Sequence, residues 1–572
     1  MTDAQEPKPT EAAKEHDTAS TERARRREAA LRRLSKTGPS KRAAAVFGIG
    51  AVAAVAAMTV AGSLWAATTP DIDTDARPAE LPSTQTFSVC PGVPMLPKGS
   101  ENGADVQFSA DSSDAVSALA VAAASDLAGN IPGMAYFAAE SSPDEEPSPT
   151  QITDSLAEDV QQGPPATAGT DGTVTNSAHF EVISDPAEEG QPIALGTEPV
   201  GGTPGIASGT TQYAATDGDL AGMTAAACTP AAHQHWLTGA TTTTGTTSVL
   251  TVTNPSATNS TVNLSVFGAD GPVEASGASD IVLAPGQTQS LLVAGLAPRQ
   301  NSVAVQVSSS GGPVAADIQQ HRLDGIVPAG VDTLQPATAG SNVVVPVLQI
   351  PGDAEDIADE SGLDGQSPTL HVASTGSAVS ATITLRGPDG PVDVPTEASA
   401  IELAPGASTT VDLSGVEPGT YAVEIDADAN VVASADSLAY NPAGDNEDAT
   451  GNTSAVDTAY MPSTAPIRGE TMVALPAIAD PESRLILTSA EEATVSVTPI
   501  DDEGQRGEEL TQELSGETAV TVEEEDAAGY LLETGANDVH AGVLVDSSAG
   551  ISAMPVNTVN ETGSGLPVRL GY

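Results

Sequence analysis

The sequence predicts an all-β chain of tandem immunoglobulin- or fibronectin-like β-sandwiches, preceded by one transmembrane helix. Three observations support this fold class. An internal repeat recurs at an offset of 119–120 residues, its segments alternate apolar and polar residues with period two, and residues 43–69 form an apolar run without a charge. A β-propeller is the alternative, because each repeat could instead supply propeller blades.

The apolar run at 43–69 is long enough for a helix that crosses a membrane. Twenty-seven residues at 1.5 Å each extend about 40 Å, more than the roughly 30 Å hydrocarbon core of a bilayer. Lys41 and Arg42 stand immediately before the run, and Trp65 lies near its far end. The positive-inside rule places the N-terminus in the cytoplasm, and Trp65 suits the opposite interface. We favour an uncleaved signal anchor over a signal peptide cleaved near 61–63.

Charge divides the chain at the same place. Eleven Lys and Arg against seven Asp and Glu precede residue 43, whereas nine against seventy follow it, which leaves net charges of +4 and -61. The total of -57 excludes nucleic acid as a general partner, because the phosphate backbone would be repelled. We therefore expect a basic tail in the cytoplasm and an acidic region outside the cell.

The repeat defines the expected organisation of the acidic region. Its first copy carries TVNLSVFGADGPV at 261–273 and IVLAPGQTQSLLVAGL at 281–296, and the second carries ATITLRGPDGPV at 381–392 and IELAPGASTTVDLSGV at 401–416. A weaker third copy begins near RLILTS at 484–489. The alternation is typical of antiparallel strands with one buried face, and the Asp-Gly and Pro-Gly pairs indicate turns between them.

The expected domains follow from these features. They are a cytoplasmic basic tail at 1–42, the transmembrane helix at 43–69, a linker at 70–86, an irregular β-rich N-terminal region at 87–245 with an acidic loop at 138–176, and β-sandwich repeats at 246–338, 339–442 and 456–572.

Two cysteines, Cys90 and Cys228, both follow the apolar run. In an oxidising compartment such a pair most simply forms one disulfide, which would close a loop of about 140 residues and stabilise the fold by about 3–5 kcal/mol. Two free thiols and a pair of metal ligands are the alternatives.

The segment from 227 to 273 carries a resemblance to a known family. Its elements are Cys228, the Trp-Leu-x-Gly stretch at 236–239, the Thr-Asn-Pro at 253–255 and VFGADGPV at 266–273. They resemble an uncharacterised family of actinobacterial membrane-anchored cell-envelope proteins, a domain of unknown function with a secreted β-rich ectodomain. Cys-Pro-Gly at 90–92 and HRLDGIVPAGVD at 321–332 fit the same family. The resemblance implies membrane topology but no known activity.

His233 and His235 would lie on one face of a strand, where Zn²⁺ accepts two imidazoles. A third ligand at suitable spacing is not visible, so we expect a polar rim beside the core residue Trp236 and no metal.

Two acidic segments bear on Ca²⁺. Asp426 to Asn430 opens like a calcium loop but lacks the Gly and Glu at the positions such a loop requires, so we expect a turn. The acidic cluster at 353–360 is expected to be a solvated linker, with loose Ca²⁺ binding as the alternative.

The sequence carries no recognisable catalytic or cofactor-binding motif, and its aromatic content of 3% argues against platforms on which sugars stack. We therefore expect a non-enzymatic structural or interaction module of the cell envelope, held to the membrane by one helix, with an envelope protein or glycan as partner. The alternatives are an accessory subunit of envelope glycan synthesis or export and a hydrolase with an unrecognised carboxylate site.

Overall fold

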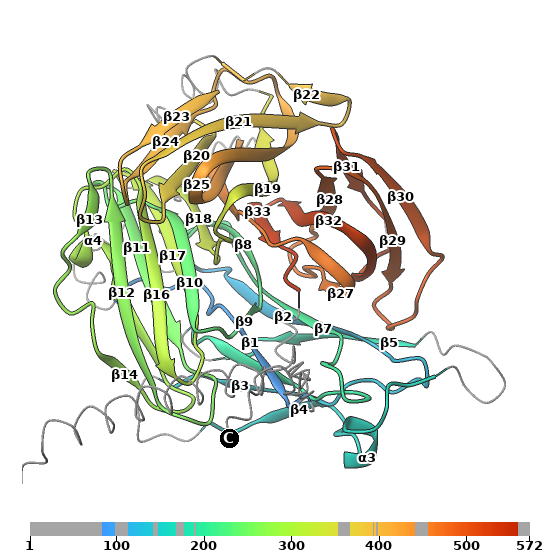
Figure 1. The fold of residues 1–572 in the computed structure, drawn as a ribbon. Coiled ribbons are helices and arrows are strands. Elements are labelled where there is room, and N and C mark those ends of the chain that lie inside the picture. The colour runs from blue at the N-terminus through green and yellow to red at the C-terminus, as the bar shows by residue number, and fades with distance from the viewer. Residues whose placement is uncertain are drawn as a thin grey trace, which may run out of the picture. The chain divides into compact units, whose positions relative to one another are not determined.

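Four successive β modules surround a common centre in a propeller-like arrangement (Figure 1). This computed structural model describes residues 83–97, 112–140, 147–167, 177–187, 190–325, 327–352, 367–392, 394–395, 399–440, 456–524 and 526–558. All of these residues fall within one compact unit, Glu80–Gly565. The prediction of an all-β fold is confirmed, and the helices of the described residues are short: α3 (Glu158–Gln161) and α4 (Val293–Leu296).

Module 2 shows the plan of each module most clearly. Its first sheet has the strand order β10-β16-β12-β13, with β14 beside β12, and its second has the order β15-β11-β17-β18. The strands are β10 (Gln234–Ala240), β11 (Thr246–Thr253), β12 (Ser260–Gly268), β13 (Gly271–Val273), β14 (Ile281–Leu283), β15 (Thr288–Leu292), β16 (Val303–Gly311), β17 (Ala315–Asp324) and β18 (Val327–Leu334).

Alternating side chains from the two sheets make the core of this module. Val262 and Val305 of the first sheet and Leu250 and Ile318 of the second are all fully buried in one cluster. Burying each side chain of this size stabilises the fold by about 1.5–3 kcal/mol. The β12–β13 hairpin depends on Gly271, whose φ of 114° would strain any residue with a Cβ atom. The period-two pattern of the sequence therefore becomes two half-buried sheets.

Modules 3 and 4 repeat this order, but one long strand replaces the pair β16 and β17. Module 3 contains β19 (Gly340–Ile350), β20 (Thr369–Ser374), β21 (Val379–Gly387), β22 (Gly390–Val392), β23 (Ala400–Leu403), β24 (Ser408–Asp412), β25 (Gly419–Tyr440) and β26 (Val456–Pro462). Module 4 contains β27 (Ile467–Ala474), β28 (Glu482–Ser489), β29 (Glu492–Ile500), β30 (Leu510–Ser515), β31 (Ala519–Val522), β32 (Gly529–Ser547) and β33 (Gly550–Pro555). The first half of β25 pairs with β19 in one sheet layer, and its second half pairs with β20 in the other layer. In the same way, β32 pairs with β27 through its first half and with β28 through its second half.

Module 1 has the same topology, which the sequence did not reveal. Its sheets have the orders β4-β3-β6-β1-β9 and β5-β2-β7-β8. The strands are β1 (Thr86–Cys90), β2 (Val116–Ala124), β3 (Met134–Ala138), β4 (Thr150–Thr153), β5 (Ala178–Ser184), β6 (Ile193–Thr197), β7 (Ala207–Ala215), β8 (Gly222–Ala227) and β9 (Thr229–Pro230). Strand β4 and helix α3 both lie within the segment expected to be an acidic loop.

The last strand of each module lies at the centre of the molecule. These inner strands are β8, β18, β26 and β33, and each packs against the inner strands of the two neighbouring modules. Each inner strand pairs on one side with the strand before it in its own sheet. Its other edge faces the centre, so the backbone N–H groups on that edge need partners from other modules.

The tandem immunoglobulin-like arrangement is therefore not the one found, and the propeller alternative is closer to the structure. Each module buries a core of its own, as a tandem sandwich would, but here the inner strands of all four modules also pack together. The predicted turn at Asp426–Asn430 is also wrong. These residues belong to β25, where the strand passes from one sheet layer to the other and Asp428 accepts a hydrogen bond from the Ser380 N–H at 2.9 Å.

Among the described residues, no helix is long and apolar enough to cross a membrane. The helix predicted at 43–69, together with Lys41, Arg42 and Trp65, lies outside the described residues, and so does the acidic cluster at 353–360.

Candidate functional site

One carboxylate joins all four inner strands. Asp457 of β26 is fully buried, and its Oδ2 accepts hydrogen bonds from the N–H groups of Met223 in β8 and Ile551 in β33, at 2.9 and 3.0 Å. Its Oδ1 accepts a third from the N–H of Val331 in β18 at 3.0 Å. The side chain of one module thereby accepts one backbone hydrogen bond from the inner strand of each of the other three modules.

Glycines leave the space that this carboxylate needs. A Cβ atom added to Gly550 would lie 1.8 Å from Asp457 Oδ2, and one added to Gly222 would lie 2.7 Å from Oδ1. Both glycines directly precede residues that donate to Asp457. Close approach of a carboxylate to a strand edge therefore explains why these positions carry no side chain.

Asp332 of β18 and Ser552 of β33 complete the central network. Asp332 Oδ2 accepts from the Tyr460 N–H at 2.7 Å, and its Oδ1 accepts from the Ser552 hydroxyl at 2.9 Å. The Ser552 Oγ in turn accepts from the Ala225 N–H at 2.8 Å. The network runs through all four modules, because Tyr460 belongs to β26 and Ala225 to β8.

Burial changes the acidity of both central carboxyl groups. It raises the pKa of Asp457 to about 7, although four backbone N–H groups act to lower it. Burial also raises the pKa of Asp332 well above its ordinary value, and the charge of Asp457 adds to this effect. The uncharged forms therefore persist to a much higher pH than in an exposed aspartate.

The inner strands end together at a cavity of about 320 Å³, the axial cavity. Residues just after β8, β18 and β26 and at the end of β33 line it, together with the start of β10. These lining residues are Thr229, Pro230, Ala232, Gln234, His235, Trp236, Pro336, Ala337, Thr338, Ala339, Thr464, Ala465, Pro555, Val556, Asn557 and Thr558. No Asp, Glu, Lys or Arg is among them, in a chain whose net charge is -57.

Two polar side chains at this cavity, those of His235 and Thr229, have atoms left for a ligand to hydrogen-bond. His235 Nε2 lies 2.7 Å from the Val314 carbonyl oxygen, so Nε2 carries the hydrogen and Nδ1 is left as an acceptor. Burial lowers the pKa of His235, which keeps the imidazole neutral. Thr229 is 6% exposed, and its buried hydroxyl has no hydrogen-bond partner in the part of the chain that the structure describes. Uncharged hydroxyl, amide and imidazole groups thus define the chemistry of the cavity.

A profile of a family of unknown function, DUF5719, matches residues 182–525, which is more than half of the chain. The chain belongs to this family. A comparison with curated proteins found no match. The DUF5719 match begins in β5 of module 1 and continues past β31 of module 4, so it includes the inner strands β8, β18 and β26.

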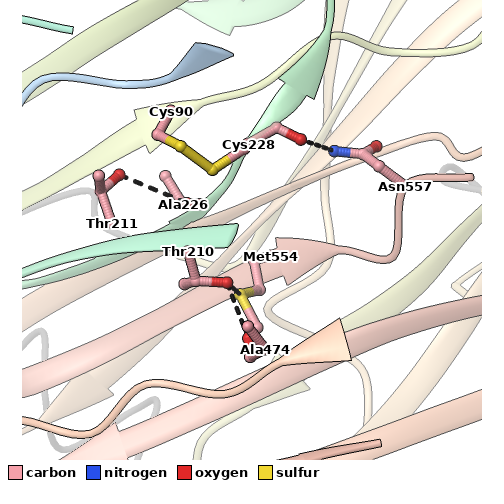
Figure 2. The surroundings of a disulfide bond; sticks show 8 residues. All are labelled: Cys90, Thr210, Thr211, Ala226, Cys228, Ala474, Met554 and Asn557. Atoms are coloured by element: carbon pink, nitrogen blue, oxygen red, sulfur yellow. Dashed lines mark hydrogen bonds between the residues drawn. A yellow bond between two sulfur atoms is a disulfide. The ribbon is translucent and has the colours of Figure 1, made fainter. Parts of the chain in front are cut away.

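The disulfide predicted for this DUF5719 chain is confirmed. Cys90 at the end of β1 and Cys228 after β8 are bonded and join the two sheets of module 1 (Figure 2). Cys228 also borders a second cavity of about 190 Å³, which shares Pro230, Asn557 and Thr558 with the axial cavity. The Asn557 side-chain amide donates to the Cys228 carbonyl at 3.2 Å, so the disulfide supports the wall between the two cavities.

The two histidines proposed as possible zinc ligands have separate partners. His233 Nδ1 lies 3.2 Å from the Ser309 hydroxyl, whereas His235 bonds to Val314. Within the described ranges, no group of three or more His, Cys, Asp or Glu side chains is placed to hold a metal ion.

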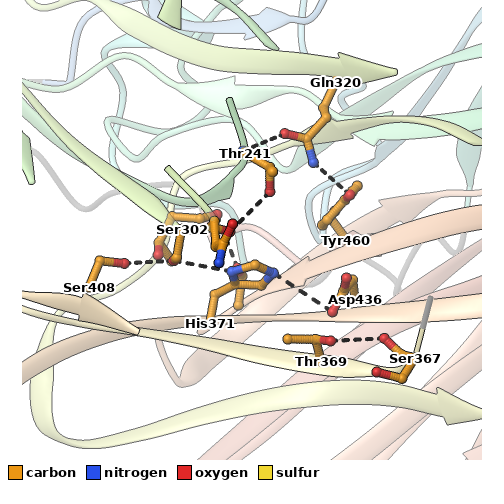
Figure 3. A network of polar contacts seen from close by, with 12 residues as sticks. Thr241, Ser302, Gln320, Ser367, Thr369, His371, Ser408, Asp436 and Tyr460 are labelled. Atoms are coloured by element: carbon orange, nitrogen blue, oxygen red, sulfur yellow. Dashed lines mark hydrogen bonds and ion pairs between the residues drawn. The ribbon is translucent and has the colours of Figure 1, made fainter. Parts of the chain in front are cut away.

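A Ser-His-Asp arrangement lies between modules 2 and 3 of the DUF5719 chain (Figure 3). Ser302 Oγ lies 3.2 Å from His371 Nδ1, and His371 Nε2 lies 3.8 Å from Asp436 Oδ1. The second distance exceeds a hydrogen bond, and Ser302 also bonds to the Ser408 hydroxyl at 2.6 Å. Ser302 and His371 are 2% and 3% exposed and line none of the cavities described in this section. The arrangement therefore serves as a polar contact between modules rather than as a nucleophile open to substrate.

A cleft of about 390 Å³ between modules 1 and 4 contains carboxylates that sequence analysis could not assign. Glu470 of β27 and Glu533 of β32 are directly opposed in antiparallel register, and Arg506 lines the same cleft. Burial and then the charge of Glu533 raise the pKa of Glu470, while Arg506 lowers it. Directly opposed like charges destabilise a sheet. The sequence does not reveal this pair, because the two residues become neighbours only when β27 and β32 pair.

Proposed function

We propose that the chain is a single-pass, membrane-held extracytoplasmic protein of the cell envelope whose four modules act as one interaction module. The observation that carries the proposal is the axial cavity, because a closed ring of inner strands presents uncharged polar groups at one mouth. Concave sites with a few convergent polar groups are where folded domains bind ligands. A rigid centre also limits the conformational entropy that a bound partner would cost.

Two features support a location outside the cytoplasm. The Cys90–Cys228 disulfide is of a kind that persists in oxidising compartments. The change from a basic segment before residue 43 to an acidic one after it agrees with the positive-inside rule. Both features fit a chain whose N-terminus is cytoplasmic and whose C-terminal region is extracellular.

Two measurements on intact cells test the proposal. Added protease should cleave the region after residue 70 and spare the tail at 1–42. A photo-crosslinking residue at Thr338 or Thr464, on the rim of the axial cavity, should capture an envelope component. The same residue at Thr521, an exposed position of β31 in module 4, is the matched control and should capture none. A C-terminal region fully shielded until lysis, or equal capture at Thr521, would contradict the proposal.

A hydrolase is the second candidate, and the Glu470–Glu533 pair favours it. Two opposed carboxylates in one cleft, one with a raised pKa, are the arrangement that glycoside hydrolysis uses. Its test is the release of reducing sugar from envelope glycans by the full chain. Catalysis by this pair requires that Glu470→Gln and Glu533→Gln each lower the rate at least 100-fold, whereas Glu492→Gln, at the start of β29, should not.

A further inference from the structure

We infer that the axial cavity binds a neutral carbohydrate, an inference that names the ligand class of the proposed interaction module and therefore rests on that proposed function.

The lack of charged side chains around the cavity argues against an ionic ligand. Among the described residues that line the cavity there is no Asp, Glu, Lys or Arg, and its histidine is held neutral by burial. A buried anion or cation would find no opposite charge there, and its desolvation would not be offset. A ligand that fits is therefore uncharged.

The hydrogen-bonding side chains that line the cavity suit a ligand with many hydroxyl groups. Thr229, which lines the cavity, has a buried hydroxyl without a partner among the described residues, and His235, which also lines it, has Nδ1 left as an acceptor. Thr464 Oγ1 is already oriented by His540 Nδ1 at 3.1 Å. A hydroxyl of a sugar can donate to one group and accept from another, which matches a wall of threonine, amide and imidazole groups.

The backbone at the rim argues against an extended peptide. The Ala337 N–H donates to the Trp236 carbonyl at 2.7 Å, and the Thr338 N–H donates to the Ser463 carbonyl at 2.7 Å. The Thr464 N–H donates to the Val344 carbonyl at 2.9 Å. A peptide that adds to a strand edge needs free N–H and C=O groups, and these rim groups are occupied. We therefore expect side chains, rather than the backbone at the rim, to bind the ligand.

Volume sets the size of the ligand. A cavity of about 320 Å³ is at the lower end of the range for ligand sites, which suits one or two sugar rings. The adjoining cavity of about 190 Å³ shares Pro230, Asn557 and Thr558 with it and extends the site toward Cys228. A glycan longer than one ring would follow this direction.

Titration calorimetry on the purified full chain tests the inference. The neutral probes are glucose, galactose, mannose and maltose, and the charged probes are glucuronate and glucosamine. We expect saturable one-site binding of at least one neutral probe and at least tenfold weaker binding of the charged ones. Thr229→Val should weaken binding about tenfold, the loss of one hydrogen bond, while Thr229→Ser keeps the hydroxyl and should restore it.

Thr521→Val, on the exposed face of β31, is the matched control and should bind like the wild type. Absence of saturable binding by every neutral probe would overturn the inference. So would binding that Thr229→Val leaves unchanged, or binding of tetra-alanine with acetylated and amidated termini in place of the sugars. Those results leave the protease and crosslinking tests of the proposed function untouched, whereas failure of those tests would remove the proposed function itself.

Discussion

The carboxylate of Asp457 accepts a hydrogen bond at 2.9 Å from the backbone N–H of Met223, which lies 234 residues earlier in the chain. The same carboxylate accepts from Val331 and Ile551, so modules 1, 2 and 4 all donate to a side chain of module 3. A module that unfolds must break this centre. We therefore expect the four modules to unfold together rather than one by one.

Substitution by asparagine should destabilise the fold to different extents at the two central aspartates, Asp457 and Asp332. In Asp457→Asn the new NH₂ group faces at least one backbone N–H, because both carboxylate oxygens now accept. In Asp332→Asn the amide oxygen can accept from Tyr460 while its NH₂ donates to Ser552 Oγ. We expect Asp457→Asn to be less stable than Asp332→Asn by about 1–3 kcal/mol, measured by urea unfolding at pH 7. Equal stability of the two variants would contradict this assignment.

The contribution of the two central aspartates to stability should fall as pH rises toward neutrality. The folded chain holds protons on Asp457 and Asp332 at pH values where an unfolded aspartate, with a pKa of 3.8, has lost them. The stabilisation is complete below about pH 4 and is lost as pH rises through the folded pKa of Asp457, about 7. Burial lowers the pKa of His321 and His540 to about 4, so these histidines make stability rise with pH over part of the same range. The decline is therefore measured as the difference in thermal unfolding between the unaltered chain and an aspartate variant from pH 4.5 to 8.

The variant Asp332→Asn is the control for this pH dependence. One titrating group contributes at most about 1.4 kcal/mol per pH unit, so its removal should make the decline shallower by up to that amount. A decline of the same slope in the variant would show that other groups cause it.

The strand pattern of modules 2 and 3 could be predicted because it rests on local chemistry. Alternation places Val262 inward and Asn263 outward whatever the strand pairs with, and Asp270-Gly271 marks a hairpin by its backbone preference. The Cys90–Cys228 bridge could be predicted because the chain has no other cysteine to pair. Each inference needed only neighbouring residues or a count.

Module 1 and the central network could not be predicted. Strand β2 reads VSALAVAAA and β8 reads GMTAAA, and such runs of small residues lack the period-two contrast that marks a half-buried strand. Asp457 looks like any other acidic residue among seventy-seven, because its role depends on edges of strands from three other modules. A local sign of this centre is the Ala-Gly pair that recurs in three inner strands, as Ala-Gly-Met-Thr at 221–224, Ala-Gly-Val-Asp at 329–332 and Ala-Gly-Ile-Ser at 549–552.

Gly550→Ala should destabilise the fold through the same centre. The added Cβ would lie 1.8 Å from Asp457 Oδ2, so β33 or the carboxylate must move. We expect a loss of about 1–3 kcal/mol in the free energy of unfolding. Gly295→Ala is the control, because a Cβ there meets nothing within 4 Å, and it should change stability by less than about 1 kcal/mol. Similar losses in both variants would argue against crowding at the carboxylate.

Loss of the disulfide should cost more than any single hydrogen bond. Cys90 and Cys228 are 138 residues apart, and closing a loop of this length restricts the unfolded chain by about 4–5 kcal/mol in the chain-entropy model. The double variant Cys90→Ser and Cys228→Ser should lose stability of this order in chemical unfolding. An unchanged midpoint would mean that the packing of module 1 does not need the bridge.

Amide hydrogen exchange in Asp457→Asn tests most directly whether one side chain unites the four modules. The substitution lies in β26, yet we predict faster exchange at the N–H groups of Met223, Val331 and Ile551, each in a different module. Asp332→Asn should leave the same three amides protected. Faster exchange confined to β26 and its neighbours in module 3 would contradict the account.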